Sequence, residues 1–198
     1  MLLRCHARVE SAHRDADYTV CVMYDASMQV YILTGPPAAG KNTIAAAFAK
    51  RRSRCAVIDV DLVRWMVVQP HKAPWDGEEG RQQQRLGVQN TCMLATRFVQ
   101  AGFDVVIVDV VSPETAAIYR WELAQYAPRI VLLLPTLAAI EQRNIARGPR
   151  LKHEEITQLY EQQSSLTAYD ERIDNTHASA DMVAEHLTKL STRAIAKP

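Results

Sequence analysis

Positions 35–43 of the chain read Gly-Pro-Pro-Ala-Ala-Gly-Lys-Asn-Thr, and this segment is the strongest indicator of the fold in the sequence. The segment matches the pattern GxxxxGK and lies between an apolar, β-rich run at 29–34 and an Ala-rich helical pattern at 42–52. Glycines there let backbone N–H groups close around phosphate oxygens, and the following helix directs its positive dipole end at the same anion. Lys41 would bridge the β- and γ-phosphates of a nucleotide as a point charge. The expected nucleotide-binding residues are Gly35, Pro36, Pro37, Ala38, Ala39, Gly40, Lys41, Asn42 and Thr43.

The residue after the lysine departs from this pattern. Asn42 stands where a Ser or Thr normally gives its hydroxyl to Mg²⁺, and Thr43 follows one place later. An amide oxygen also binds a hard cation, directly or through water, because Mg²⁺ accepts oxygen donors generally and keeps several waters. We therefore expect ATP and Mg²⁺ as cofactors, with Asn42 as a metal ligand.

Outward from this loop, strand-like and helix-like segments alternate along the chain. Leu86, Met93, Leu94 and Phe98 fall near one face of the helix expected at 81–101, and the breakers in 69–80 indicate a loop. Strands are expected at 29–34, 55–60, 104–110, 129–134 and 172–175, and the other helices at 42–52, 62–68, 114–126, 136–147, 152–169 and after Ser179.

Strands separated by helices of this length require right-handed crossovers and a mainly parallel sheet. The sequence therefore predicts the α/β class. The expected architecture is a three-layer α/β/α P-loop NTPase fold with about five strands and an Arg-bearing lid near residues 143–152.

Composition excludes several classes of protein. A chain of 198 residues fits one domain with or without an appendage, and 23 Lys and Arg against 22 Asp and Glu leave a net charge of +1. That charge supplies no general attraction to nucleic acid or to an anionic membrane. The apolar runs are far shorter than the roughly 20 residues that cross a bilayer, and no secretory apolar region follows Met1. We expect a cytoplasmic protein with reduced thiols at Cys5, Cys21, Cys55 and Cys92.

Four further segments follow the loop, and their order along the chain is informative: IDVD at 58–61, VVIVDVV at 105–111, RNIARG at 143–148 and IDNT at 173–176. With the loop, they make residues 29–190 resemble P-loop small-molecule and nucleotide kinases, particularly chloramphenicol phosphotransferase-like and shikimate kinase-like proteins. The resemblance implies phosphoryl transfer from ATP, with Asp61 facing the acceptor and Asp59 facing the metal-bound water. The glycine-rich substrate segment of shikimate kinases is absent at 110–113, which argues against shikimate itself. Residues 28–198 are thus expected to form a P-loop kinase domain, and residues 1–27 an N-terminal extension.

Three aspartates are candidates for acceptor chemistry. Asp59 and Asp61 lie two residues apart at a strand end, so their side chains should leave one face at the carboxyl edge of the sheet, where such folds hold ligands. A hydroxyl acceptor needs a carboxylate to orient it and take its proton, which makes Asp61 the candidate general base. The alternative is that Asp61 caps the next helix. Asp109 ends the third expected strand at the same edge and is a candidate substrate ligand.

The candidate basic groups are arginines. Arg143 and Arg147 lie four residues apart on one helix face, and Arg150 follows the turn after them. Planar guanidinium groups match the equatorial oxygens of a transferring phosphoryl group, so Arg143 and Arg147 are catalytic candidates, with a solvated helix end as the alternative. Arg64 lies on the acceptor side as a candidate substrate ligand. Asn175, where related kinases contact the adenine ring, is a candidate nucleotide ligand.

Together these residues predict an ATP-dependent phosphotransferase that acts on a small molecule, and the paired aspartates favour a hydroxyl acceptor. A nucleoside monophosphate kinase is the alternative within the same class. A P-loop ATPase or nucleotide-dependent switch is the alternative from another class. No nucleic-acid or membrane partner is expected, and the sequence leaves the oligomeric state open.

Overall fold

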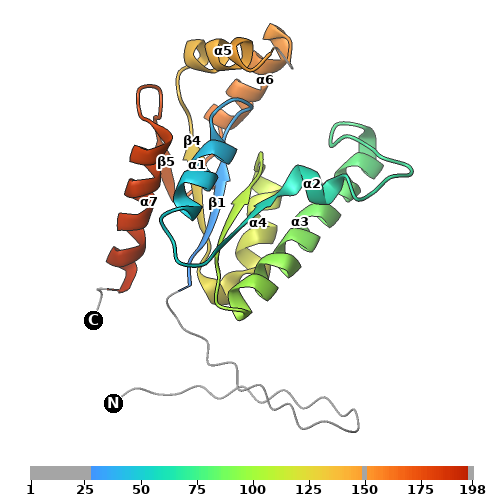
Figure 1. The fold of residues 1–198 in the computed structure, drawn as a ribbon. Coiled ribbons are helices and arrows are strands. Elements are labelled where there is room, and N and C mark those ends of the chain that lie inside the picture. Colours follow the sequence, from blue (N-terminus) through green and yellow to red (C-terminus); the bar gives the residue numbers. More distant parts are fainter. Residues whose placement is uncertain (1–27, 149–150, 196–198) are drawn as a thin grey trace, which may run out of the picture.

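The structure, a computed structural model, describes residues 28–148 and 151–195, with side chains as far as residue 190. Residues 1–27, which carry the expected extension with Cys5 and Cys21, lie outside the described part, as does Arg150. The elements shown in Figure 1 are, in chain order, β1 (Val30–Thr34), α1 (Lys41–Ala49), β2 (Cys55–Asp59), α2 (Val60–Arg64), α3 (Gly77–Gln100), β3 (Asp104–Val108), α4 (Pro113–Glu122), η1 (Ala124–Tyr126), β4 (Arg129–Leu133), α5 (Leu137–Ala146), α6 (His153–Ser164), β5 (Glu171–Ile173) and α7 (Ala180–Ile195).

The five strands form one parallel sheet in the order β2-β3-β1-β4-β5. Strand β1 is central and fully buried, and its Ile32 lies opposite Ile107 of β3 and Ile130 of β4. Both faces of the sheet are covered, since parallel strands joined by helical crossovers are buried on both sides. The prediction of an α/β fold with a five-stranded parallel sheet is confirmed.

Two apolar layers hold the helices against the sheet. On one face, α3 and α4 supply side chains such as Val88 and Tyr119 to a core that includes Ile32. On the other face, Phe48 of α1 and Leu187 of α7 pack into a second core. The sheet therefore lies between two helical layers (Figure 1).

Helix α3 begins at Gly77, four residues before the position predicted from the sequence. Glu78 and Glu79 in its first turn stabilise this start, because their negative charges lie at the positive end of the helix dipole. Gln83 then holds the preceding loop, because its amide donates to the Pro70 carbonyl at 2.8 Å and accepts from the backbone N–H of Lys72 at 2.9 Å. The expected loop at 69–80 is correspondingly shorter.

The apolar residues expected near one face of α3 are not part of its buried face. Leu86, Met93, Leu94 and Phe98 are all exposed. The helix instead turns a face of mostly small side chains inward, which allows close approach to α2 and α4: Gly80, Gly87, Val88, Thr91, Cys92, Ala95 and Val99. Cys55 and Cys92 are free thiols, and burial raises their pKa to about 11 and about 12.

A buried polar ring connects helix α6 to the sheet. The hydroxyl of Thr34, at the end of β1, donates to Gln163 Oε1 at 2.9 Å and accepts from the backbone N–H of Val111 at 2.9 Å. Gln163 Nε2 donates in turn to the Val111 carbonyl at 2.9 Å. Each of these polar groups has a hydrogen-bond partner within the ring, so the ring fixes the position of α6 beside the loop that follows β3. In the described part of the chain, no helix combines the length and the hydropathy needed to cross a membrane.

Candidate functional site

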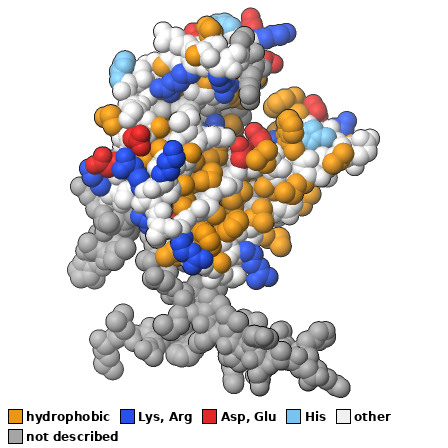
Figure 2. Space-filling model, viewed as in Figure 1, with side chains coloured by type: hydrophobic (Ala, Val, Ile, Leu, Met, Phe, Trp, Pro, Cys, Tyr) orange, Lys and Arg blue, Asp and Glu red, His pale blue; other side chains and the backbone are white. Residues whose placement is uncertain are grey.

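A cavity of about 640 Å³ opens at the carboxyl edge of the sheet. Figure 2 shows this region as a hollow between the lobe of α5 and α6 and the arm that contains α2 and the start of α3. Most of the predicted site residues line it: Pro37, Ala38, Gly40, Lys41, Asn42, Thr43, Asp59, Asp61, Asp109, Arg143, Arg147 and Asn175. Residues from five separate segments of the chain therefore meet at one place, as expected where parallel strands end.

The backbone of the 35–43 loop adopts a conformation that glycine makes possible. Gly35 and Gly40 have φ angles of 139° and 97°, in the region that side chains disfavour. A Cβ atom on Gly35 would also collide with the carbonyl oxygen of Leu133 on β4. The loop is thereby held close to the sheet, directly before helix α1.

Lys41 is folded over its own loop. Its Nζ donates to the carbonyl oxygens of Gly35 at 2.7 Å and Pro36 at 3.1 Å. Burial lowers the pKa of Lys41 to about 8, against the opposing effect of Asp109, Asp61 and, less strongly, Asp59. A bound phosphate would give this amine a negative partner and favour its charged form.

Asp59, not Asp61, caps the helix after β2. Asp59 Oδ1 accepts from the backbone N–H of Asp61 at 3.1 Å, and α2 begins at Val60. The alternative that Asp61 serves only as the helix cap is therefore wrong, because the helix starts one residue before it. The Asp61 side chain is 70% exposed and lines the cavity.

Asp59 and Asn42 lie in contact. Asn42 Nδ2 donates to Asp59 Oδ2 at 2.9 Å, which places an amide and a carboxylate side by side near the loop. Within the described residues, no three His, Cys, Asp or Glu side chains gather as a metal cage. Mg²⁺ in nucleotide sites is held by one or two protein oxygens together with phosphates and water, so this pair fits such an ion.

Asp109 directly follows β3 and has a neighbour that the sequence did not reveal. The Tyr119 hydroxyl, from α4, donates to Asp109 Oδ2 at 2.9 Å, and the backbone N–H of Val110 donates to Oδ1 at 2.7 Å. Burial raises the pKa of Asp109 to about 6, while the two hydrogen bonds and Lys41 oppose the rise and Asp61 adds to it. Nothing in the sequence distinguishes Tyr119 from an ordinary core tyrosine.

Arg143 reaches the cavity wall from α5 but is engaged by backbone oxygens. Its Nη2 donates to the carbonyls of Asn175 at 2.8 Å and Thr176 at 3.3 Å, and its Nη1 to that of Ala39 at 3.4 Å. Asn175 Nδ2 donates to the same Ala39 oxygen at 2.8 Å, whereas its buried Oδ1 has no partner among the described residues. The two side chains connect the phosphate-binding loop to the segment before α7.

The other two arginines differ in exposure. Arg147, the residue after α5, is exposed, lines the cavity and donates from Nη2 to Asn144 Oδ1 at 3.2 Å. Arg64 does not line the cavity, and only 11% of its side chain is exposed. Its stem lies against Gly87 of α3, where a Cβ atom would collide with Arg64 Cγ, and its Nη1 pairs with Asp61 Oδ1 at 3.2 Å. Within the part of the chain that the structure describes, the buried Nε of Arg64 has no hydrogen-bond partner.

Three solved structures with the same fold align with this chain over nearly their whole length. APS kinase from Mycobacterium tuberculosis in complex with AMPPNP and APS has a TM-score of 0.64 at 18% identity, over 82% of this chain and 96% of that chain. The tunicamycin resistance protein of Deinococcus radiodurans has a TM-score of 0.63 at 14% identity, over 82% of this chain and 95% of that chain. Shikimate kinase from Acinetobacter baumannii in complex with shikimate has a TM-score of 0.61 at 19% identity, over 86% of this chain and 96% of that chain.

Sequence comparison defines the family. No curated protein sequence matches the chain significantly. A family model described as AAA domain matches residues 30–168, which is more than two thirds of the chain and includes the phosphate-binding loop and Asp109. The match spans the sheet from β1 through β4 and the helices between these strands. The chain therefore belongs to the AAA domain family, and it has the fold of P-loop kinases.

Proposed function

We propose that the protein is an ATP- and Mg²⁺-dependent kinase that transfers the γ-phosphate to a hydroxyl group of a small molecule. The observation that carries this proposal is the position of Asp61, whose exposed carboxylate lines the same cavity as Lys41 and the phosphate-binding loop. A carboxylate beside bound phosphates is unfavourable for binding alone, because like charges repel. It becomes useful when a neutral hydroxyl must lose its proton during attack on phosphorus.

The roles of the chain follow from the geometry. The loop and Lys41 hold the phosphates, and Asp61 orients the acceptor hydroxyl and takes its proton as the new O–P bond forms. The bond from the γ-phosphorus to the bridging oxygen breaks, and the nucleoside diphosphate leaves. Asn42 and Asp59 would hold Mg²⁺, which would supply positive charge beside the phosphates. Arg147, exposed at the cavity wall, supplies further positive charge.

Arg143 supports this mechanism in a different way from that predicted. Because three backbone carbonyls accept from its guanidinium group, it is well placed to keep the 35–43 loop aligned with the segment before α7. Contact between Arg143 and a transferring phosphate remains a prediction. Descriptions of similar structures as kinases, one with AMPPNP and APS bound, support phosphoryl transfer as the reaction class.

Arg64 favours a second candidate, a nucleoside monophosphate kinase. Its guanidinium group pairs with Asp61, which lines the cavity, so an anionic acceptor held beside Asp61 would have a positive charge nearby. A phosphate acceptor already carries negative charge and needs arginines more than it needs a base. The two candidates thus differ in their dependence on Asp61.

Transfer of labelled γ-phosphate from ATP into pooled antibiotics, nucleosides, nucleotides, sugars and metabolites tests the proposal. A phosphate ester as product supports the hydroxyl kinase, and an anhydride supports the monophosphate kinase. Asp61→Asn should then lower kcat with the ester-forming acceptor by about 10²- to 10⁴-fold, whereas Glu185→Gln, at an exposed position farther along α7 that does not line the cavity, should not. Release of labelled inorganic phosphate alone, at a rate that no pool raises, would instead identify an ATPase or switch.

A further inference from the structure

Exposed apolar side chains are concentrated on one side of the molecule. Among the large hydrophobic residues that the structure describes as exposed, all but Val57, Trp121, Ile145 and Met182 come from α2, the loop after α2, or α3. We call this set the α3 face: Leu62, Trp65, Met66, Val68, Trp75, Leu86, Met93, Leu94 and Phe98. Figure 2 shows hydrophobic side chains spread over α2 and α3 in this view.

The exposed area of the α3 face comes from α3 and from the two segments before it. Leu62, Trp65, Met66, Val68, Trp75 and Met93 each expose at least two thirds of their surface. Together the nine side chains expose on the order of 1,000 Å². A stable interface between two proteins needs about 800 Å² from each partner, so α3 reaches that area only together with α2 and the loop after α2, which pack beside it.

The charges along α3 are arranged so that the helix can pair with itself. Glu79 and Arg97 are separated by 18 residues, which is about five helical turns and about 27 Å, so they lie on the same side of the helix. Both are exposed, and neither has an ion-pair partner in the described part of the chain. Glu78, in contrast, pairs with two arginines of its own chain. Between the charged ends, the same side carries Leu86 and Met93 together with the polar residues Gln82 and Asn90.

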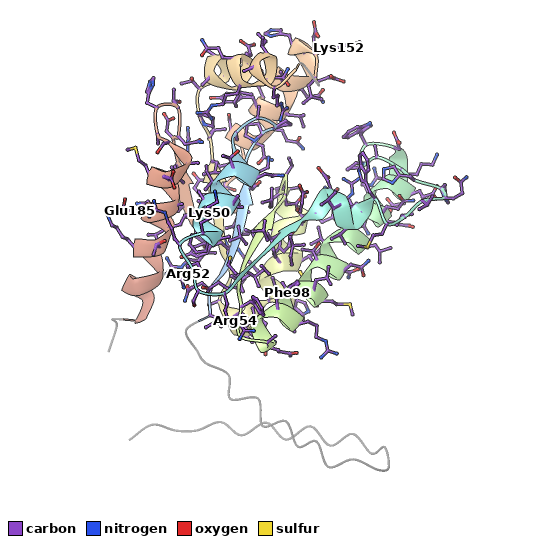
Figure 3. The ribbon with its side chains drawn as sticks, in the orientation of Figure 1. Lys50, Arg52, Arg54, Phe98, Lys152 and Glu185 are labelled. Atoms are coloured by element: carbon purple, nitrogen blue, oxygen red, sulfur yellow. The ribbon has the colours of Figure 1, made fainter. Side chains whose placement is uncertain are left out.

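We propose that two copies of the chain form a dimer in which α3 packs antiparallel against α3 of the second copy, about a two-fold axis near residue 88. This arrangement faces each Glu79 with Arg97 of the other copy and brings the two apolar centres together. It also brings Trp75, just before α3, toward the C-terminal end of the other α3. Phe98 lies at that end, beside Arg54 (Figure 3), and its ring is 6.0 Å from that of Phe103.

The same two-fold operation explains why opposite charges occupy the two ends. In an isologous contact, each residue meets its counterpart across the axis, so a helix with one sign at each end attracts its antiparallel copy and repels a parallel one. The side of α3 that carries Leu86 and Met93 between these two charges is thus complementary to itself. This inference rests on the surface of α3 and is independent of the reaction proposed above.

The test measures the oligomeric state of the full 198-residue chain by sedimentation velocity over a hundredfold range of concentration. We expect a dimer. Glu79→Arg and Arg97→Glu should each weaken it by on the order of tenfold, because each single reversal turns two attractive pairs into repulsive ones. The double variant should return the dissociation constant to within about threefold of the original. Met93→Asp should produce a monomer, and Glu161→Arg on α6 is the control that should leave the dimer unchanged.

Circular dichroism and thermal unfolding of every variant separate loss of the dimer from loss of the fold. A full chain that stays monomeric would overturn the proposal, whether its own residues 1–27, a lipid surface or another molecule covers the α3 face. If neither single charge reversal changed the dissociation constant of the dimer, or if the double variant did not restore it, the antiparallel arrangement would be overturned.

Discussion

Replacing Asp109 by Asn should stabilise the protein above pH 6 and change its stability little below pH 4. Burial raises the pKa of Asp109 from 3.8 to about 6, so the native state disfavours the charged carboxylate. Between these two values the native protein binds more protons at this site than the unfolded chain does. The stability that Asp109 contributes is therefore present below pH 4 and is lost as the pH rises through 6.

The magnitude follows from the shift. It is about two units, and each unit corresponds to about 1.4 kcal/mol, which sets an upper limit of about 3 kcal/mol at pH 8. Asparagine keeps a carbonyl oxygen for the backbone N–H of Val110, and the Tyr119 hydroxyl can accept from the new amide instead of donating. We therefore expect Asp109→Asn to gain about 1–3 kcal/mol at pH 8 and close to nothing at pH 4.

Urea unfolding of both proteins at several pH values between 4 and 8, without nucleotide, measures this difference. Tyr119→Phe is the matched variant: it removes the hydrogen bond that lowers the pKa of Asp109, so the pH at which stability falls should move upward. A stability difference between the native protein and Asp109→Asn that is constant with pH would refute the reasoning. So would an Asp109→Asn protein that is less stable at pH 8.

Three further changes test the site and its supports. Lys41→Met should weaken binding of a fluorescent ATP analogue by about 10- to 100-fold, since it removes a charge-assisted contact to phosphate; unchanged binding would contradict its role. Gly87→Ala should cost about 1–3 kcal/mol of unfolding free energy because the new methyl group displaces Arg64, and the cost should shrink when Arg64→Ala is added. Gln163→Leu should cost about 1–3 kcal/mol by leaving the buried Thr34 hydroxyl without its acceptor; equal stability in urea would show that the ring contributes little.

Much of the architecture was readable from local sequence. Alternation of apolar β-rich runs with helical patterns predicted five strands and their parallel arrangement, and the structure confirms both. The position of GxxxxGK between β1 and α1 placed the phosphate-binding loop. The boundaries were less accurate, as in α3, because Gln83 and the loop that it holds are brought together by packing that a local pattern does not show.

The sequence by itself determined which residues would reach the carboxyl edge of the sheet, since strand periodicity and parallel connections are encoded over short stretches of chain. Only the tertiary structure decided what each of them contacts there. In the folded chain, the Tyr119 hydroxyl donates to Asp109, the stem of Arg64 packs against Gly87, and the guanidinium group of Arg143 donates to backbone carbonyls. Such contacts join residues up to 104 positions apart, and they depend on how closely helices approach one another, which the volumes of many side chains set together.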